Sequence, residues 1–78
     1  MEAYIFVNTG PDMLWKVAEE SLKIDAVKAA HAVTGQYDVV MHAVFGNMET
    51  LGELICKIRT IKGVIRTQTA VVVPPRIY

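Results

Sequence analysis

The residues best suited to contacting a small molecule form a short polar segment between two apolar runs, Gly35-Gln36-Tyr37-Asp38. Gly35 allows a close approach of the backbone, whose N–H groups could meet a carboxylate, and the Asp38 side chain could hold an ammonium group. The same residues are also typical of a tight turn, in which Gly35 supplies the backbone geometry and Asp38 caps the bend. Both interpretations stay open at this point.

Thr67 and Thr69 are a second candidate, because they lie two residues apart in a β-branched segment near the carboxyl end. Side chains of a strand alternate between its faces, so the two hydroxyls point to the same side. Threonine is also common in strands for reasons of packing alone. The pair is therefore a candidate partner for the polar segment, or simply part of a strand.

Residues that could support catalysis or metal binding are scattered along the chain: Asn8, Trp15, His31, Asp38 and His42. The two histidines are predicted to lie near each other on paired strands, which is more typical of packing than of a metal site without a third ligand. Cys56 is the only cysteine, which excludes an internal disulfide, and we expect it to be a buried structural thiol. The sequence thus favours a protein that is no enzyme and has neither metal nor cofactor.

The elements that must position these residues begin with four strands, because four segments are rich in apolar, β-branched and aromatic residues. The predicted strands span residues 3–7, 26–34, 37–45 and 64–73. Gly35-Gln36 fits a two-residue turn that joins the two middle strands into a hairpin. Pro74 and Pro75 end the last strand, because neither can donate a backbone hydrogen bond.

Two amphipathic segments predict helices. The first is capped by Thr9 or Gly10, has Pro11 and Asp12 in its first turn, and ends near Lys23. Its predicted inner face contains Leu14, Val17, Ala18 and Leu22, with Ser21 on the same side, while Met13 and Trp15 should pack on the core or a neighbouring subunit.

The second helix begins at the cap residue Asn47, has basic residues at its carboxyl end, and is followed by Gly63 as its C′ residue. Its predicted apolar stripe is Leu51, Leu54, Ile55 and Ile58.

The resulting order, β-α-β-β-α-β, contains an internal repeat, since Ile24–Val27 and Ile61–Val64 are similar and lie 37 residues apart. A repeated β-α-β unit predicts an α+β, ferredoxin-like fold with a four-stranded antiparallel sheet and both helices on one face. We expect one domain over residues 1–73 and an extended tail over residues 74–78, which either docks on an adjacent subunit or is disordered.

Composition points to self-association, because 53% of this 78-residue chain is apolar and its strands are apolar on both faces. The sheet face without helices therefore needs a cover, and a symmetric sheet-to-sheet dimer supplies one. Eight basic residues balance eight acidic ones, and no basic run favours direct contact with nucleic acid. With neither a basic leader nor a long apolar segment, the sequence predicts a cytoplasmic protein without membrane contact.

Several of these segments together resemble the effector-binding domain of the Lrp/AsnC feast/famine transcription regulators, the RAM domain. The matching segments are Tyr4–Asn8, Ile24–Val27, Val33–Asp38, Leu51 with Leu54, and Ile61–Thr69. Members of that family normally carry an amino-terminal helix-turn-helix domain, whereas this sequence starts with the first strand. If this sequence is the whole protein, it resembles the stand-alone modules of the family; if it is a fragment, we expect the full protein to bind DNA.

The resemblance implies a non-catalytic amino-acid-binding and oligomerisation module that acts in transcription regulation or amino-acid metabolism. It implies dimers that assemble to octamers or decamers, with full-length Lrp/AsnC relatives as further partners. An amino acid would lie between dimers, in contact with Gly35, Gln36, Tyr37, Asp38, Thr67 and Thr69. Glu53 on the second helix would favour a basic ligand side chain. Two alternatives remain, namely a small ferredoxin-like dimeric enzyme of isomerase or monooxygenase type, and an assembly module without a ligand.

Overall fold

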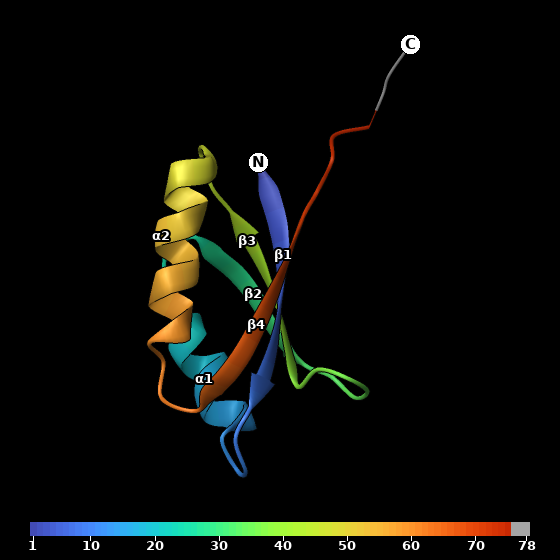
Figure 1. Cartoon of the computed structure of the whole chain (residues 1–78), viewed down its shortest axis with the longest axis vertical. Helices are drawn as coiled ribbons and strands as arrows, with labels where there is room; N and C mark the ends of the chain where they lie inside the picture. Colours follow the sequence, from blue (N-terminus) through green and yellow to red (C-terminus); the bar gives the residue numbers. More distant parts are fainter. Residues whose placement is uncertain (76–78) are drawn as a thin grey trace.

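The computed structural model describes residues 1–75 and has the predicted β-α-β-β-α-β order (Figure 1). Its elements are β1 (Glu2–Thr9), α1 (Leu14–Ser21), β2 (Val27–Ala32), β3 (Val39–Val44), α2 (Met48–Arg59) and β4 (Val64–Val71). The four strands pair in the order β2-β3-β1-β4, and each neighbouring pair is antiparallel. The α+β, ferredoxin-like fold is therefore confirmed.

Both helices cover the same face of the sheet (Figure 1). The hydrophobic core lies between the sheet and this pair of helices. Alternate residues of the two central strands point into this layer, and all of them are fully buried: Ala3, Ile5 and Val7 of β1, and Val39, Met41 and Ala43 of β3. The helices contribute the buried side chains Val17, Leu51, Leu54 and Ile58. Every second residue of the strands and about every third or fourth residue of the helices thus contribute to one apolar layer.

The opposite side of the sheet, which we call the open face, is not covered by any segment of residues 1–75 (Figure 1). Tyr4 and Phe6 of β1 lie on it beside Val40 and Val44 of β3, and Tyr4 and Val44 are 43% and 40% exposed. Polar residues, among them His42, interrupt this apolar surface. The predicted sheet-to-sheet dimer would bury these side chains, and it stays a prediction.

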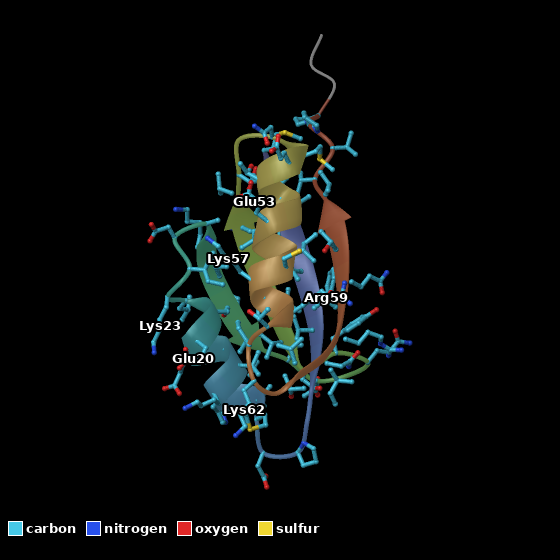
Figure 2. The ribbon with its side chains drawn as sticks, turned by 60° about the vertical axis from the view of Figure 1, so that its left-hand side comes forward. Glu20, Lys23, Glu53, Lys57, Arg59 and Lys62 are labelled. Carbon is cyan, nitrogen blue, oxygen red and sulfur yellow. The ribbon has the colours of Figure 1, made fainter. Side chains whose placement is uncertain are left out.

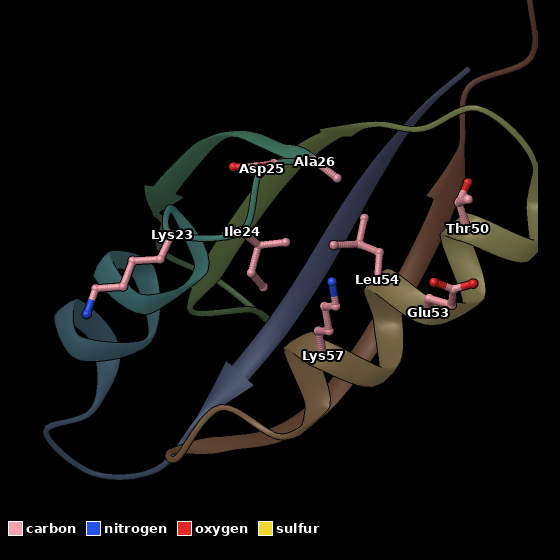
Figure 3. Close-up of a pocket in the computed structure, with 8 residues that line it drawn as sticks. All are labelled: Lys23, Ile24, Asp25, Ala26, Thr50, Glu53, Leu54 and Lys57. Carbon is pink, nitrogen blue, oxygen red and sulfur yellow. The ribbon is translucent and has the colours of Figure 1, made fainter.

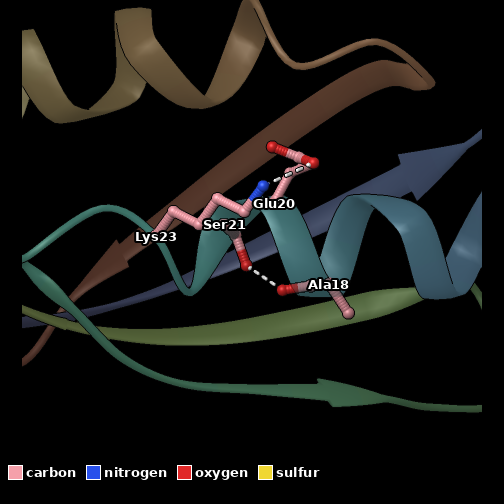
Figure 4. Close-up of polar contacts among 4 residues, drawn as sticks. All are labelled: Ala18, Glu20, Ser21 and Lys23. Atoms are coloured by element: carbon pink, nitrogen blue, oxygen red, sulfur yellow. Dashed lines mark hydrogen bonds and ion pairs between the residues drawn. The ribbon is translucent and has the colours of Figure 1, made fainter.

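Helix α1 is shorter than predicted at both ends. It begins at Leu14, because the positive φ of Asp12 (60°) and a bond from the Met13 N–H to the Gly10 carbonyl (3.1 Å) make a turn first. It ends at Ser21, which is fully buried and whose hydroxyl donates to the Ala18 carbonyl at 2.7 Å (Figure 4). The prediction that Leu22 faces inward is wrong, since the chain has left the helix there and Leu22 is 50% exposed.

Helix α2 begins as predicted at Asn47, whose Oδ1 accepts the Thr50 N–H at 2.9 Å while Thr50 Oγ1 accepts the Asn47 N–H at 3.1 Å. The prediction that Gly63 is the C′ residue is wrong, because the C-cap is Thr60 and Gly63 lies further along, in the link to β4. Gly63 has a φ of 105°, and its carbonyl accepts the Gly10 N–H at 2.8 Å. Gly63 therefore joins the turn before α1 to the start of β4.

Cys56 is exposed, so the prediction of a buried thiol is wrong. It lies two residues after the buried Leu54, which places it about 200° around the helix on the outer side. Ile55 is half-buried and packs against the rim of the core. The predicted stripe therefore narrows to three buried residues: Leu51, Leu54 and Ile58.

The prediction of a two-residue hairpin turn is also wrong. The Val33 N–H donates to the Asp38 carbonyl at 2.9 Å, which encloses the four residues 34–37, and both middle strands are shorter than predicted. Strand β1 is longer than predicted at both ends, whereas β4 ends at Val71. After the Val72 N–H has bonded to the Glu2 carbonyl (2.9 Å), β1 offers no further partner. The predicted tail is described only as far as Pro75, and residues 76–78 lie outside the described residues.

Candidate functional site

The β2–β3 loop, residues 33–38, carries four of the predicted contact residues and projects beyond the sheet on the side of the open face (Figure 1). The Tyr37 ring packs on Phe6 of β1, with centroids 5.2 Å apart, and its hydroxyl donates to the Gln68 side chain of β4. Gly35 has a φ of 105°, and a Cβ added at this position would meet nothing within 4 Å. The loop is thus anchored at Tyr37 and open at Gly35.

A chain of polar contacts joins the loop to two strands. The Asn8 side chain of β1 donates to the Gln36 carbonyl at 2.7 Å. The same amide accepts from Arg66 of β4, whose Nε and Nη2 lie 3.3 and 3.2 Å from Asn8 Oδ1. Asn8 therefore connects the loop backbone to the guanidinium group of Arg66.

Asp38 holds the base of the loop through three hydrogen bonds. Its N–H donates to the Val7 carbonyl at 2.9 Å, its carbonyl accepts from Val33, and its Oδ2 accepts the Thr9 N–H at 2.8 Å. The carboxylate takes the place of a strand carbonyl just before β3 begins, where β1 extends beyond its pairing with β3. One oxygen of Asp38 is thus structural, and Oδ1 makes no hydrogen bond within residues 1–75.

Thr67 and Thr69 lie on the other side of the sheet from Tyr37. They are paired with Val7 and Ile5, whose side chains are buried beneath the helices, so the two hydroxyls also point to the helix side. The structure therefore places the threonine pair at the same end of β1 and β4 as the loop but not on the same face.

The backbone of the two threonines faces the free edge of β4, which is the last strand of the sheet. The Val72 N–H bonds to the Glu2 carbonyl, and in an antiparallel ladder bonded pairs alternate with unbonded ones. Counting back from Val72, the alternation directs the N–H and C=O groups of Thr67 and Thr69 away from β1. These groups are available to a ligand or another chain.

A hollow of about 330 Å³, which we call the β4-edge hollow, is lined by Arg59, Val64, Ile65, Arg66 and Thr67. It lies where the carboxyl end of α2 meets the start of β4, and Figure 2 shows Arg59 beside that strand. The pairing register of β1 and β4 shifts here, because Asn8 faces Arg66 but Thr9 faces Val64. The extra residue, Ile65, makes a β-bulge, a feature often found next to functional sites.

Glu53 is not brought to the loop. It lies in the amino-terminal half of α2, away from Arg59 (Figure 2), and lines a different hollow of about 400 Å³ between α2 and the turn before β2. Figure 3 shows Ile24 and Leu54 at the centre of that hollow. Thr69 lines neither hollow. Of the predicted contact residues, only Thr67 therefore reaches the β4-edge hollow.

The residues considered for catalysis do not converge within residues 1–75. His42 Nε2 lies 2.7 Å from Glu2 Oε1 on the open face, with its ring 5.2 Å from that of Tyr4. His31 is paired with Val40, which makes it a diagonal neighbour of His42, as predicted. Trp15 is 69% exposed on α1, although Met13 packs on the core as predicted. No three metal-ligating side chains gather in the described part of the chain.

Sequence reasoning missed Arg59, Arg66 and Gln68, which the structure places beside the loop or the β4-edge hollow. A signal for two of them was present, because Arg66 and Gln68 alternate with Thr67 and Thr69 on a strand of period two. The sequence did not show that Arg66 and Gln68 contact β1 and the loop, because this depends on the order of the strands in the sheet.

Comparison with known proteins decides the family, because the Lrp/AsnC ligand binding domain matches residues 2–75. The chain belongs to the Lrp/AsnC ligand binding domain family. Uncharacterized HTH-type transcriptional regulators of Pyrococcus furiosus and Pyrococcus abyssi are 34% and 33% identical to it over 73 residues, which cover 88% of this chain. The same residues cover 49% of each regulator, so this Lrp/AsnC domain spans about half the length of those relatives.

Solved structures agree with the family. A hypothetical protein from Pyrococcus horikoshii is 27% identical with a TM-score of 0.87, covering 95% of this chain and 90% of that chain. The AsnC protein of E. coli is 25% identical with a TM-score of 0.82, covering 99% of this chain and 53% of that one. A transcriptional regulator from Neisseria meningitidis, solved as an L-Met complex, shares the fold at 22% identity (TM-score 0.84; 99% of this chain, 52% of that one). No helix within residues 1–75 is long and apolar enough to cross a membrane.

Proposed function

We propose that this Lrp/AsnC domain is a non-catalytic amino-acid-binding and oligomerisation module that acts in the regulation of transcription or of amino-acid metabolism. The observation that carries the proposal is the anchored β2–β3 loop, which Tyr37 and Asp38 fix against β1 and β4 while Gly35 stays open. The effector contacts are the loop residues Gly35, Gln36, Tyr37 and Asp38 together with Thr67 and Thr69.

The chemistry of these groups suits a free amino acid. Backbone N–H groups and hydroxyls can donate to an α-carboxylate, and the free Oδ1 of Asp38 can accept from an α-ammonium group. The Neisseria meningitidis regulator, which has the same fold, was solved as an L-Met complex, and this supports a ligand of the same class. Glu53 is excluded from the proposed site because it lies at another hollow.

Assembly completes the proposal. The open face forms the sheet-to-sheet dimer, because Tyr4, Phe6, Val40 and Val44 expose apolar surface that no segment of residues 1–75 covers. Dimers then associate into octamers or decamers, with the effector between them and full-length relatives as further partners. The relatives are transcriptional regulators, which supports a cytoplasmic location for the proposed module.

Thermal unfolding with each of the twenty amino acids tests the binding, because a ligand that binds only the folded state raises the midpoint. We expect at least one amino acid to raise the midpoint of the wild type. Thr67→Val, which removes the hydroxyl and keeps the shape, should reduce that shift, whereas Thr67→Ser should retain it. If no amino acid changes the midpoint, the binding proposal fails and the module without a ligand is supported.

Mass measurement by light scattering tests the assembly. Tyr4→Glu places a charge on the open face and should convert dimers or larger assemblies to monomers. Lys16→Glu, on the exposed side of α1, serves as the control for a charge change elsewhere and should leave the mass unchanged. A wild-type protein that is monomeric at micromolar concentration would contradict the proposed dimer.

A further inference from the structure

We infer that the β4-edge hollow selects a ligand with a negatively charged side chain, so the effector is a dicarboxylic α-amino acid. This inference rests on the proposed function and names the class of its ligand. Thr67 lines the hollow and is the one predicted contact residue that does so. Its other lining residues decide the charge it accepts.

The lining of the hollow is positively charged. Arg59 and Arg66 are two of its five lining residues, and none of the five carries a carboxylate. Neither arginine takes part in an ion pair within residues 1–75, where the ion pairs are Lys23 with Glu20 and His42 with Glu2. The carbonyl end of α2 offsets part of the Arg59 charge. A second negative charge on the ligand is therefore favoured, and a positive one is repelled.

Hydrogen-bonding groups in the hollow point to the same ligand class. Guanidinium groups only donate hydrogen bonds, and their fork matches a carboxylate. Thr67 adds a hydroxyl and an outward backbone N–H at the free edge of β4. The lining thus offers more donors than one α-carboxylate needs, which leaves donors for a side-chain carboxylate.

Arg66 is held in place for this role. Its Nε and Nη2 donate to Asn8 Oδ1, Nη1 makes no hydrogen bond within residues 1–75, and the Asn8 amide is itself oriented by the Gln36 carbonyl. A fixed guanidinium group loses less conformational freedom when a carboxylate binds. The contact also joins Arg66, a lining residue of the hollow, to the backbone of the loop.

The geometry reverses the expectation from the sequence. Glu53 suggested a basic ligand, but it lies in the other hollow, together with Lys57 and away from the loop. Basic groups, not acidic ones, line the cavity at the loop end of β4. An acidic ligand is therefore the one that complements the site.

Isothermal titration of the wild-type protein with aspartate, glutamate, asparagine, glutamine and lysine tests this inference. We expect aspartate or glutamate to bind at least tenfold more tightly than its amide, because the two have the same size and shape but only the acid carries a side-chain charge and two acceptor oxygens. Binding should weaken with added salt, and lysine should not bind. Each titration uses the same buffer and protein concentration.

Two variants locate the interaction. Arg59→Gln should weaken binding of the acidic ligand at least tenfold while leaving the amide ligand almost unchanged. Lys28→Gln removes one positive charge from an exposed residue of β2, the strand at the opposite edge of the sheet from β4, and should have no effect. Circular dichroism and the unfolding midpoint confirm that both variants fold.

The outcomes separate the inference from the proposed function. If a neutral or basic amino acid binds best, or if Arg59→Gln does not distinguish acid from amide, the inference is overturned while the proposed binding function stands. If none of the twenty amino acids binds, the proposed function fails and the inference fails with it.

Discussion

Two glycines with the same φ allow the energetic cost of crowding Met13 against Gly63 to be measured by comparison. Gly35 and Gly63 both have a φ of 105°, so replacing either by alanine imposes the same left-handed strain, about 1–2 kcal/mol. Their surroundings differ. A Cβ at Gly63 would lie 2.8 Å from Met13 Cβ and 2.9 Å from Met13 Cε, whereas a Cβ at Gly35 has no neighbour within 4 Å.

The clash sets the expected difference between the two variants. Overpacking of this kind typically adds about 1–3 kcal/mol. Gly35→Ala should therefore reduce the free energy of unfolding by about 1–2 kcal/mol, and Gly63→Ala by about 2–5 kcal/mol, from the strain and the overpacking together. The Cβ of Met13 is fixed to the backbone and cannot rotate away, and the Gly63 carbonyl is tied to the Gly10 N–H at 2.8 Å.

Urea unfolding at equal protein concentration measures both changes, since the concentration must be fixed for a chain that associates. Met13→Ala removes Cγ and Cε and should relieve part of the clash, so the Gly63→Ala and Met13→Ala changes should be non-additive. If Gly63→Ala and Gly35→Ala destabilise the protein by the same amount within about 0.5 kcal/mol, Met13 does not hold the start of β4 and the reasoning is refuted.

Three further changes test other parts of the structure by the same measurement. Asn47→Ala removes the cap of α2 and should lower the free energy of unfolding by about 1 kcal/mol; an unchanged value would contradict the role of this cap. Ile58→Ala should lower it by about 2–5 kcal/mol because Ile58 is fully buried, while Ile65→Ala, at a 69% exposed residue, should change it by less than about 0.5 kcal/mol. Asp38→Ala should lower it by about 1–2 kcal/mol by leaving the Thr9 N–H without its acceptor, and Asp38→Asn, which keeps an acceptor, by less; equal losses would show that the contact is unimportant.

The periodicity of apolar residues was sufficient to predict the fold. Each element buries one face, and the spacing of its apolar residues shows whether it is a helix or a strand. It did not predict where elements end. Helix α1 stops at Ser21 because the N–H groups of Lys23 and Ile24 bond to carbonyls only three residues back, and no glycine or proline in the sequence marks this end. The loop of the hairpin is longer than predicted because the side chains of Tyr37 and Asp38 bond to β4 and β1, and neither residue belongs to β3.

The candidate site was predictable only where it is continuous in sequence. The four loop residues lie together in the chain, but Arg66 and Asn8, which join the loop to the β4-edge hollow, are 58 residues apart. Their contact depends on the pairing of β1 with β4, and the hollow depends on the bulge at Ile65, which shifts the register. A sequence read for its strands does not specify either feature.

The position of Tyr37 links ligand binding to assembly in the proposed module. Its ring packs on Phe6, which belongs to the open face, and its hydroxyl bonds to Gln68 on the strand that carries Thr67. In the proposed module, a dimer that covers the open face holds the Phe6 side chain, on which Tyr37 packs. A ligand bound by the loop holds Tyr37, the other partner of the same contact. Since coupling between two binding events is reciprocal, an effector that binds the assembled form more tightly must strengthen assembly by the same factor. In the proposed module, an amino acid held by the anchored loop therefore alters the oligomeric state without any contact between the ligand and the open face.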